Sequence, residues 1–299
     1  MPAQNSNIPH TSDDVSLYGL FSLFFEGWKI IIGAAILSAV LSAVWAIQQP
    51  NIYSVEAMLM PSEDTDSGLD GLSGKLGGLA AVAGVSMPEG KGNNTKFAVQ
   101  LLKSQSFLAK FIEDNDILLP LMASEGWDIK TNKLIWNEEL YDETNNEWIR
   151  KVEAPLKAKP SFIEAQKKLR ERLQIVQDPK TKFVRVAMEF YSPHLAAEWV
   201  NKLVAYLNDH IRVMDLNESN RSIDYLQKLI SESKISGLQL MFSGLMEEQI
   251  KSKMLASIRI DYVLKTIDPA VAPEKKSKPL RSLIVIIAGF LGSIVGIII

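Results

Sequence analysis

One uncharged stretch decides the fold: it runs from Ile30 to Ile47 and reads IIIGAAILSAVLSAVWAI. As an α-helix these 18 residues span roughly 27 Å, close to the ~30 Å hydrocarbon core of a bilayer. Trp28, Lys29 and Trp45 stand at the ends of the stretch, as interfacial anchors do. A signal peptide is the alternative, and it is disfavoured because the preceding residues are acidic rather than basic. We therefore expect a transmembrane helix over residues 28–47, preceded by a tail over residues 1–27.

One face of this helix carries only small side chains. Ala34, Ser38, Ser42 and Ala46 recur at every fourth position. Small residues let two helix backbones approach closely in lipid, so this face is predicted to pack on another membrane helix. The alternative is that Ala and Ser are simply common in membrane helices.

A second apolar run, Leu283–Ile299, ends the sequence. It contains Gly289, Gly292 and Gly296, of which the last two form a G-x-x-x-G pattern that suits a helix contact. We expect a second transmembrane helix over residues 283–299. No polar residue caps it, so the helix is expected to be truncated.

The composition predicts a folded chain without catalytic chemistry. Its net charge is −3 and 47% of its residues are hydrophobic, which excludes a disordered chain and disfavours nucleic acid as a partner. It has no cysteine, and its three histidines lie outside metal-binding and nucleophile motifs. We expect no enzyme activity, no catalytic residue, no metal and no cofactor.

Alternating apolar residues predict strands beside both membrane helices. The first covers Tyr53–Leu59 and ends at Pro61, and the second, returning to the membrane, covers Ile260–Lys265. A hairpin is predicted between them. Its parts are a helix over Phe162–Leu173, a strand over Leu173–Val176, a turn at Asp178–Lys180 and a strand over Phe183–Phe190.

Three further segments have a recognisable character. Phe97–Leu119 has helical spacing and is predicted to form one or two helices ending at Pro120. Trp127–Pro160 shows no clean period and is interpreted as irregular structure held by aromatic side chains, which core packing explains better than sugar stacking. Gly68–Gly92 is glycine-rich and is interpreted as a loop, with a short amphipathic turn as the alternative.

A very long helix is predicted from the cap at Ser192–Pro193 to about Ile235, with a break at Gly237 and a second helix over Leu238–Ile258. Its apolar stripe includes Trp199, Leu203, Leu207 and Ile211. A thin, charged helix of this length cannot be buried by its own domain, so these residues are expected to contact neighbouring copies. The predicted fold is α+β, with a membrane-proximal α/β base and a long helical stalk over residues 48–282.

The approach to the second apolar run resembles the Wzz-type polysaccharide chain-length determinants, which are polysaccharide co-polymerases. The resemblance is carried by Pro269, Pro273 and Pro279 and by the glycines that follow them. Looser matches continue upstream to the first apolar helix. These are Lys253–Ala256, Asp261–Lys265, Ser192–Pro193 with Ala196, Ala197 and Asn201, and Leu102–Leu108.

The resemblance implies an inner-membrane protein with a cytoplasmic N-terminal tail, two membrane helices and a periplasmic domain that assembles as a homo-oligomeric ring. It implies a regulator of the modal length of a surface polysaccharide, most often lipopolysaccharide O-antigen. The implied partners are a Wzy-type polymerase and lipid-linked polysaccharide. Basic residues precede the second apolar run, and because positively charged flanks favour the cytoplasmic side they would place the central domain in the cytoplasm. Long loops, however, cross membranes largely regardless of charge.

Two alternatives share this topology. One is the N-terminal part of a capsule or exopolysaccharide co-polymerase whose cytoplasmic tyrosine kinase is missing. The other is a periplasmic sensor ectodomain, which would require a ligand pocket and a signalling module.

Overall fold

The computed structural model describes residues 17–62 and 94–298, which form two compact units. Residues 17–50 and 278–298 belong to one unit, and residues 51–62 and 94–277 belong to the other. The glycine-rich stretch Gly68–Gly92 lies outside the described residues. The chain is α+β, as the sequence predicts.

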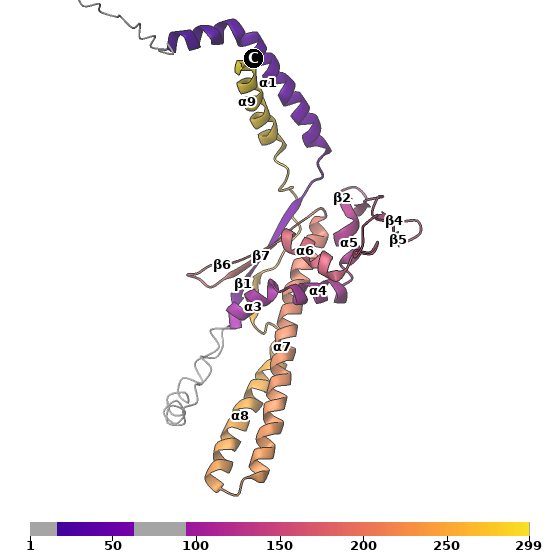
Figure 1. The fold of residues 1–299 in the computed structure, drawn as a ribbon. Helices are drawn as coiled ribbons and strands as arrows, with labels where there is room; N and C mark the ends of the chain where they lie inside the picture. The colour runs from indigo at the N-terminus through magenta and orange to yellow at the C-terminus, as the bar shows by residue number, and fades with distance from the viewer. Residues whose placement is uncertain (1–16, 63–93, 299) are drawn as a thin grey trace, which may run out of the picture. The chain divides into compact units, whose positions relative to one another are not determined.

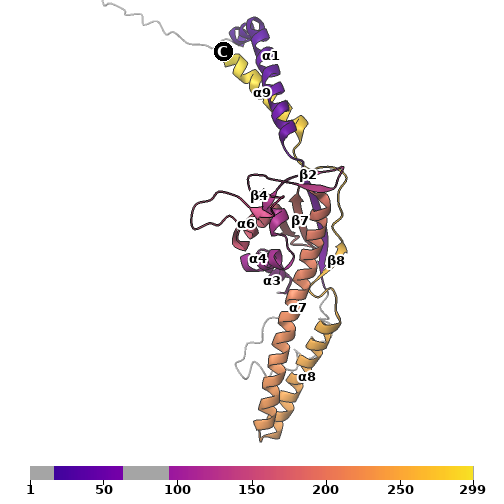
Figure 2. The same ribbon diagram turned by 90° about the vertical axis from the view of Figure 1, so that its right-hand side faces the viewer.

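The first unit is a pair of helices. α1 (Leu17–Gln48) and α9 (Arg281–Ile298) lie side by side in both views (Figures 1 and 2). Within α1, Trp28–Gln48 is long and apolar enough to cross a membrane, while the apolar part of α9, Arg281–Ile297, is shorter than such a span. The predicted second crossing is therefore present as an apolar helix, and its insertion stays a prediction.

The second unit is built on a four-stranded antiparallel sheet with the strand order β6-β7-β1-β8. The strands are β6 (Leu173–Gln177), β7 (Val184–Phe190), β1 (Tyr53–Pro61) and β8 (Leu264–Asp268). In the central pair, Tyr53 is opposite Phe190 and Leu59 is opposite Val184. The predicted hairpin is confirmed. The returning strand begins four residues later than the predicted Ile260, which is itself 90% exposed.

The core lies where the sheet meets the first half of α7 (Pro193–Glu232). Every second residue from Tyr53 to Leu59 in β1 and from Val184 to Phe190 in β7 is buried, as period-2 alternation requires. These inward residues pack with the buried stripe of α7 and with the short helices that follow β1 in the chain. The largest fully buried side chains are Phe111, Phe190, Leu59, Leu102, Leu108, Ile112, Ile117, Leu121, Leu169, Met188, Leu203 and Leu207.

Three short helices replace the one or two expected over Phe97–Leu119: α3 (Asn94–Leu102), α4 (Gln105–Asp114) and α5 (Leu118–Ala123). The predicted end at Pro120 is wrong, because Pro120 lies in the first turn of α5. Proline is tolerated there, since the first-turn N–H groups have no intrahelical partner. α6 (Phe162–Arg172) is confirmed, and it starts with a capping box between Ser161 and Glu164.

The tryptophan-rich stretch is more regular than predicted. It contains two small hairpins, one formed by β2 (Ser124–Asp128) with β3 (Lys133–Trp136) and one by β4 (Tyr141–Asp142) with β5 (Glu147–Trp148). The strands are too short to show a period in the sequence. Their turns are fixed by nearby backbone N–H groups, which donate hydrogen bonds to the carboxylates of Asp128 and Asp142.

The predicted long helix is present as α7, and it pairs with α8 (Ser236–Ile258) to form a helical hairpin (Figures 1 and 2). The cap is confirmed, since Ser192 Oγ accepts a hydrogen bond from the N–H of Leu195. The expected break between two helices is present, but it lies at Ser233–Ile235 rather than at Gly237, which is the second residue of α8.

Candidate functional site

Small residues bring α1 and α9 into close contact. A Cβ atom built on Gly292 would lie 2.8 Å from the backbone oxygen of Ala34 and 2.8 Å from the Cβ of Ser38. One built on Gly296 would lie 2.8 Å from the Cα of Ile31. Cβ atoms essentially never come this close to other heavy atoms, so only glycine fits at both positions of α9.

A hydrogen bond reinforces this contact. Ser38 Oγ donates to the carbonyl oxygen of Ala288 in α9 at 2.9 Å. Gly289 packs less tightly, since its Cβ position is 3.8 Å from Ala39 Cβ. Ser42 is half-buried, and its hydroxyl donates within α1 to Ala39. The structure therefore brings together Ala34, Ser38, Gly292 and Gly296, with Gly289 and Ser42 beside them.

Arg281, the first residue of α9, holds the end of α1. Its Nε donates to the carbonyl of Ala46 at 2.9 Å, and its terminal nitrogen donates to the carbonyl of Gln49 at 3.3 Å. The last carbonyls of a helix lack intrahelical partners and carry partial negative charge, so a guanidinium is well suited to this position. The sequence offered a signal, a basic residue at the start of an apolar run, but the contact was not predicted.

The stripe Trp199, Leu203, Leu207 and Ile211 is buried within the chain itself. All four residues are at most 3% exposed, and they belong to the core under the sheet. This corrects the reasoning that the stripe needs neighbouring copies, because β1 and β7 cover it. The exposed apolar side chains of the helical hairpin lie further along it, chiefly on α8, where Leu240 is 78% exposed and Ile258 is 67% exposed.

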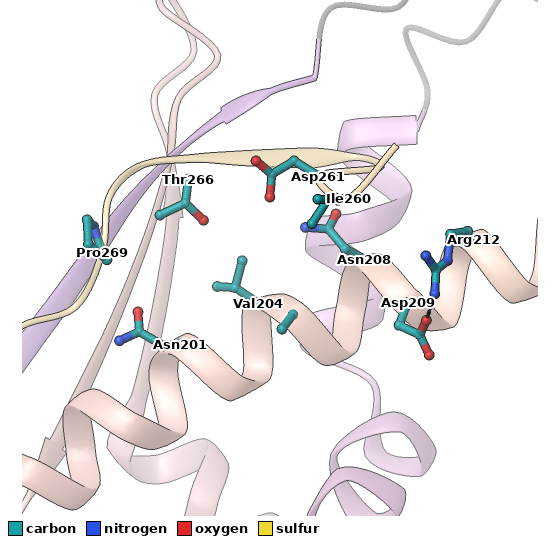
Figure 3. Close-up of a pocket in the computed structure, with 10 residues that line it drawn as sticks. Asn201, Val204, Asn208, Asp209, Arg212, Ile260, Asp261, Thr266 and Pro269 are labelled. Atoms are coloured by element: carbon teal, nitrogen blue, oxygen red, sulfur yellow. Dashed lines mark hydrogen bonds and ion pairs between the residues drawn. The ribbon is translucent and has the colours of Figure 1, made fainter. Parts of the chain in front are cut away.

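Asn201 and Asn208, seven residues apart on α7, form hydrogen bonds with the segment that connects α8 to α9 (Figure 3). Asn208 is buried, accepts from the N–H groups of Val263 and Leu264 and donates to the carbonyl of Leu264 at 2.8 Å. Asn201 makes the corresponding pair of bonds with Ala270. Because buried amides must find partners, these bonds fix the register of the returning chain on α7.

Between the asparagines lies a cavity of about 440 Å³ (Figure 3). Val204 forms its floor on α7, Thr266 of β8 lies opposite, and the Asp209–Arg212 ion pair stands at one end. The amides of Asn201 and Asn208 are already bonded to backbone, so they offer little to a ligand. We interpret this cavity as a gap in the packing between α7 and β8, which the hydrogen bonds of the two asparagines hold together.

A tyrosine–aspartate bond ties α7 to α4. The hydroxyl of Tyr206 donates to Asp114 Oδ2 at 2.8 Å, and Lys110 donates to the other oxygen. The Tyr206 bond is the main cause that lowers the pKa of Asp114, with Lys110 adding to it. Partial burial, together with this carboxylate, raises the pKa of Tyr206 well above its ordinary value.

The three prolines of the approach have separate places. Pro269 is exposed at the end of β8 and lines the cavity, and Pro273 is half-buried in the segment that follows. Pro279 precedes α9, and its carbonyl accepts a bond from the N–H of Arg281. Asn208 was missed from the sequence, although a lone amide within an apolar helical stripe is a usable signal. Among residues 17–62 and 94–298, no cluster of three potential metal ligands occurs.

An α+β domain that lies in sequence between two apolar helices defines a class of membrane-associated proteins. Within that class, residues 13–115 match the family model described as "Wzz: Chain length determinant protein", which confirms the resemblance to the chain-length determinants. No curated protein matches the chain.

Two solved structures are similar to the chain at low identity. One is described as a full-length bacterial polysaccharide co-polymerase: it is 11% identical, with 94% of this chain and 95% of that chain covered, and the TM-score is 0.39. The other is a fragment of WzzB, a polysaccharide co-polymerase from Salmonella Typhimurium: it is 10% identical, with 76% of this chain and 100% of that chain covered, and the TM-score is 0.31.

Proposed function

We propose that this protein sets the modal length of a surface polysaccharide, most simply lipopolysaccharide O-antigen, as an oligomeric scaffold that works with a Wzy-type polymerase. The observation that carries the proposal is the match of residues 13–115 to the chain-length determinant family. The scaffold makes no bond itself, and bond formation belongs to the polymerase.

The helix pair supports a place in the inner membrane. α1 and α9 turn their small residues toward each other and expose their large apolar side chains, among them Leu37, Leu41, Ile286 and Phe290. Such surfaces suit lipid or another membrane helix. In this proposal residues 1–27 lie in the cytoplasm, both helices span the membrane, and residues 48–282 lie in the periplasm.

The helical hairpin supports contact between copies. α8 exposes Leu240, Met254 and Ile258 by more than half, on an element that has few neighbours within the chain other than α7. Exposed apolar residues gathered on one element mark interaction surfaces. We propose that α8, rather than the buried stripe of α7, contacts the next copy in a ring.

Deletion of the gene, followed by gel display of the surface polysaccharide, tests the function. We expect that the cluster of bands at the modal chain length, the modal cluster, is lost while polymer is still made. The intact gene should restore this cluster. Loss of all polymer would instead indicate a role in synthesis or export. An unchanged ladder would refute the proposal.

Reporter fusions test the topology. A reporter active only in the periplasm should be active when fused at Asn145 and silent when fused at Gln4. A cytoplasmic reporter active at Asn145 would overturn the proposed arrangement.

A further inference from the structure

The two small hairpins enclose a groove that differs from the cavity beside α7. Its volume is about 490 Å³, and β3, β4 and the turns that follow them line it. Trp136 and Tyr141 form an aromatic wall, with ring centroids 6.0 Å apart, and Tyr141 stacks edge-on against Trp148 behind it. The groove therefore has one aromatic side, formed by two rings that are tilted by 58° to each other.

Aliphatic side chains continue this apolar surface. Ile135 and Ile149 both line the groove, and they are 47% and 46% exposed. The indole N–H of Trp136 has no hydrogen-bond partner among the described residues, which leaves it free to donate to a ligand. The wall thus combines apolar contact area with an available donor.

Two of the three carboxylates that line the groove are also free. Glu138 and Glu143 are exposed and form no hydrogen bond or ion pair with any described residue. Asp142 differs, since Oδ1 accepts from Thr144 and Asn145 and Oδ2 accepts from the Asn145 side chain. These bonds lower the pKa of Asp142 and hold the turn. The groove is therefore lined both by the aromatic side chains and by two free carboxylates.

This combination suits a sugar. The C–H face of a pyranose ring packs on flat aromatic and aliphatic surface, while its hydroxyls donate to carboxylates, and such charge-assisted bonds are stronger than neutral ones. A purely apolar ligand would form no bond with either exposed carboxylate, whereas a sugar hydroxyl can donate to one. An acidic glycan would be repelled by the same charges.

We propose that this groove binds a short segment of neutral or amine-bearing polysaccharide, through Trp136, Glu138 and Glu143. The inference rests on the proposed function, and it deepens that function by giving the scaffold a direct, weak contact with the growing glycan. Weak sites repeated on several copies of the chain would retain long glycans better than short ones, because each added contact raises the avidity.

Saturation-transfer NMR on the full chain in nanodiscs tests the groove. The probes are chitotriose, its deacetylated trimer, trigalacturonate, trilysine and oligosaccharides released from the cell's own surface polysaccharide, and empty nanodiscs give the background. The neutral or amine-bearing sugars should bind saturably and trigalacturonate should bind at least about tenfold more weakly. No saturable binding of any sugar, or binding of trilysine alone, overturns the proposal.

Single substitutions locate the site. Trp136→Ala and Glu138→Gln should each weaken sugar binding about tenfold, whereas Glu139→Gln, the same charge change at the next residue outside the groove, should leave it unchanged. Equal melting temperatures for the two glutamine variants show that folding is intact. Equal weakening by both variants refutes the site.

The gene-deletion experiment separates the two proposals. If deletion removes the modal cluster but the groove binds no sugar, the proposal about the groove is refuted and the chain-length function stands. A ladder that deletion leaves unchanged refutes the chain-length function, whatever the groove binds.

Discussion

Replacing Gly292 with leucine should separate α9 from α1. Even a methyl group at this position would lie 2.8 Å from the Ala34 carbonyl oxygen and from Ser38 Cβ. The helices must move apart by about 0.6 Å to restore ordinary contact for that first carbon alone, and the rest of the leucine side chain requires more. The movement also breaks the bond from Ser38 to Ala288.

The expected cost follows from these two losses. Overpacking costs about 1–3 kcal/mol, and an interhelical hydrogen bond in a membrane contributes about 0.6 kcal/mol. Together they correspond to roughly a 10- to 500-fold loss in the equilibrium constant for closing the pair. Helix formation itself should survive, because leucine has a higher helix propensity than glycine.

The absence of cysteine from the sequence makes a direct assay possible. Ala39 Cβ lies 3.8 Å from the Cβ position of Gly289, which matches the usual separation in a disulfide. In an Ala39→Cys/Gly289→Cys chain, oxidation should join the helices, so that fragments cut between them stay together until they are reduced.

Adding Gly292→Leu should lower the initial rate of this crosslinking at least about tenfold. Gly33→Leu is the matched control, since nothing lies within 4 Å of the Cβ position of Gly33. Equal rates for Gly292→Leu and Gly33→Leu would refute the close contact. In cells, Gly292→Leu with Gly296→Leu should keep protein abundance and remove the modal cluster, and an unchanged cluster would assign regulation to residues 51–277.

Three further predictions concern the second unit. Asn208→Ala removes three bonds to the backbone of Val263 and Leu264 and should lower the free energy of unfolding by about 2–4 kcal/mol, more than Asn201→Ala, as measured by chemical denaturation. Tyr206→Phe removes the bond that lowers the pKa of Asp114. A depressed carboxylate pKa stabilises the fold above its unfolded value of about 3.9, so the stability difference from wild type should be full near pH 6 and shrink as the pH falls below 4, whereas Tyr225→Phe, at a 63% exposed tyrosine, should show no such trend. Leu240→Glu with Ile258→Glu should reduce the mass of the assembly in mild detergent, as measured by light scattering, and an unchanged mass would remove α8 from the proposed contact between copies.

Local patterns predicted most of the elements, and their failures have local causes. The cap at Ser192 and the turn after Asp178 were predicted because side-chain bonds to nearby backbone define them, and both bonds are present. The prediction that a helix ends at Pro120 was wrong, because proline is also tolerated in the first turn of a helix and the sequence does not show where α5 starts. The hairpins around Trp136 and Trp148 were missed because two- to five-residue strands show no period.

The candidate sites divide in the same way. The small residues of both apolar helices were visible in the sequence, because spacing of three or four residues places them on one face. Their pairing, with Ser38 against Ala288 and Arg281 against the end of α1, joins segments far apart in the chain. The hydrogen-bond partners of Asn208 are also far from it in the sequence, so only the folded chain reveals that this amide joins α7 to the returning segment.

The sequence by itself determined which segments are apolar, where the strands of the four-stranded sheet lie and that one helix is exceptionally long, since each depends on the pattern of neighbouring residues. Only the tertiary structure decided which face of that helix is covered. The sequence predicted that the stripe from Trp199 to Ile211 needs other copies, yet β1 and β7 bury it within the chain. Burial depends on contacts between distant segments, and hydrophobic spacing along one helix predicts a buried face without identifying what buries it.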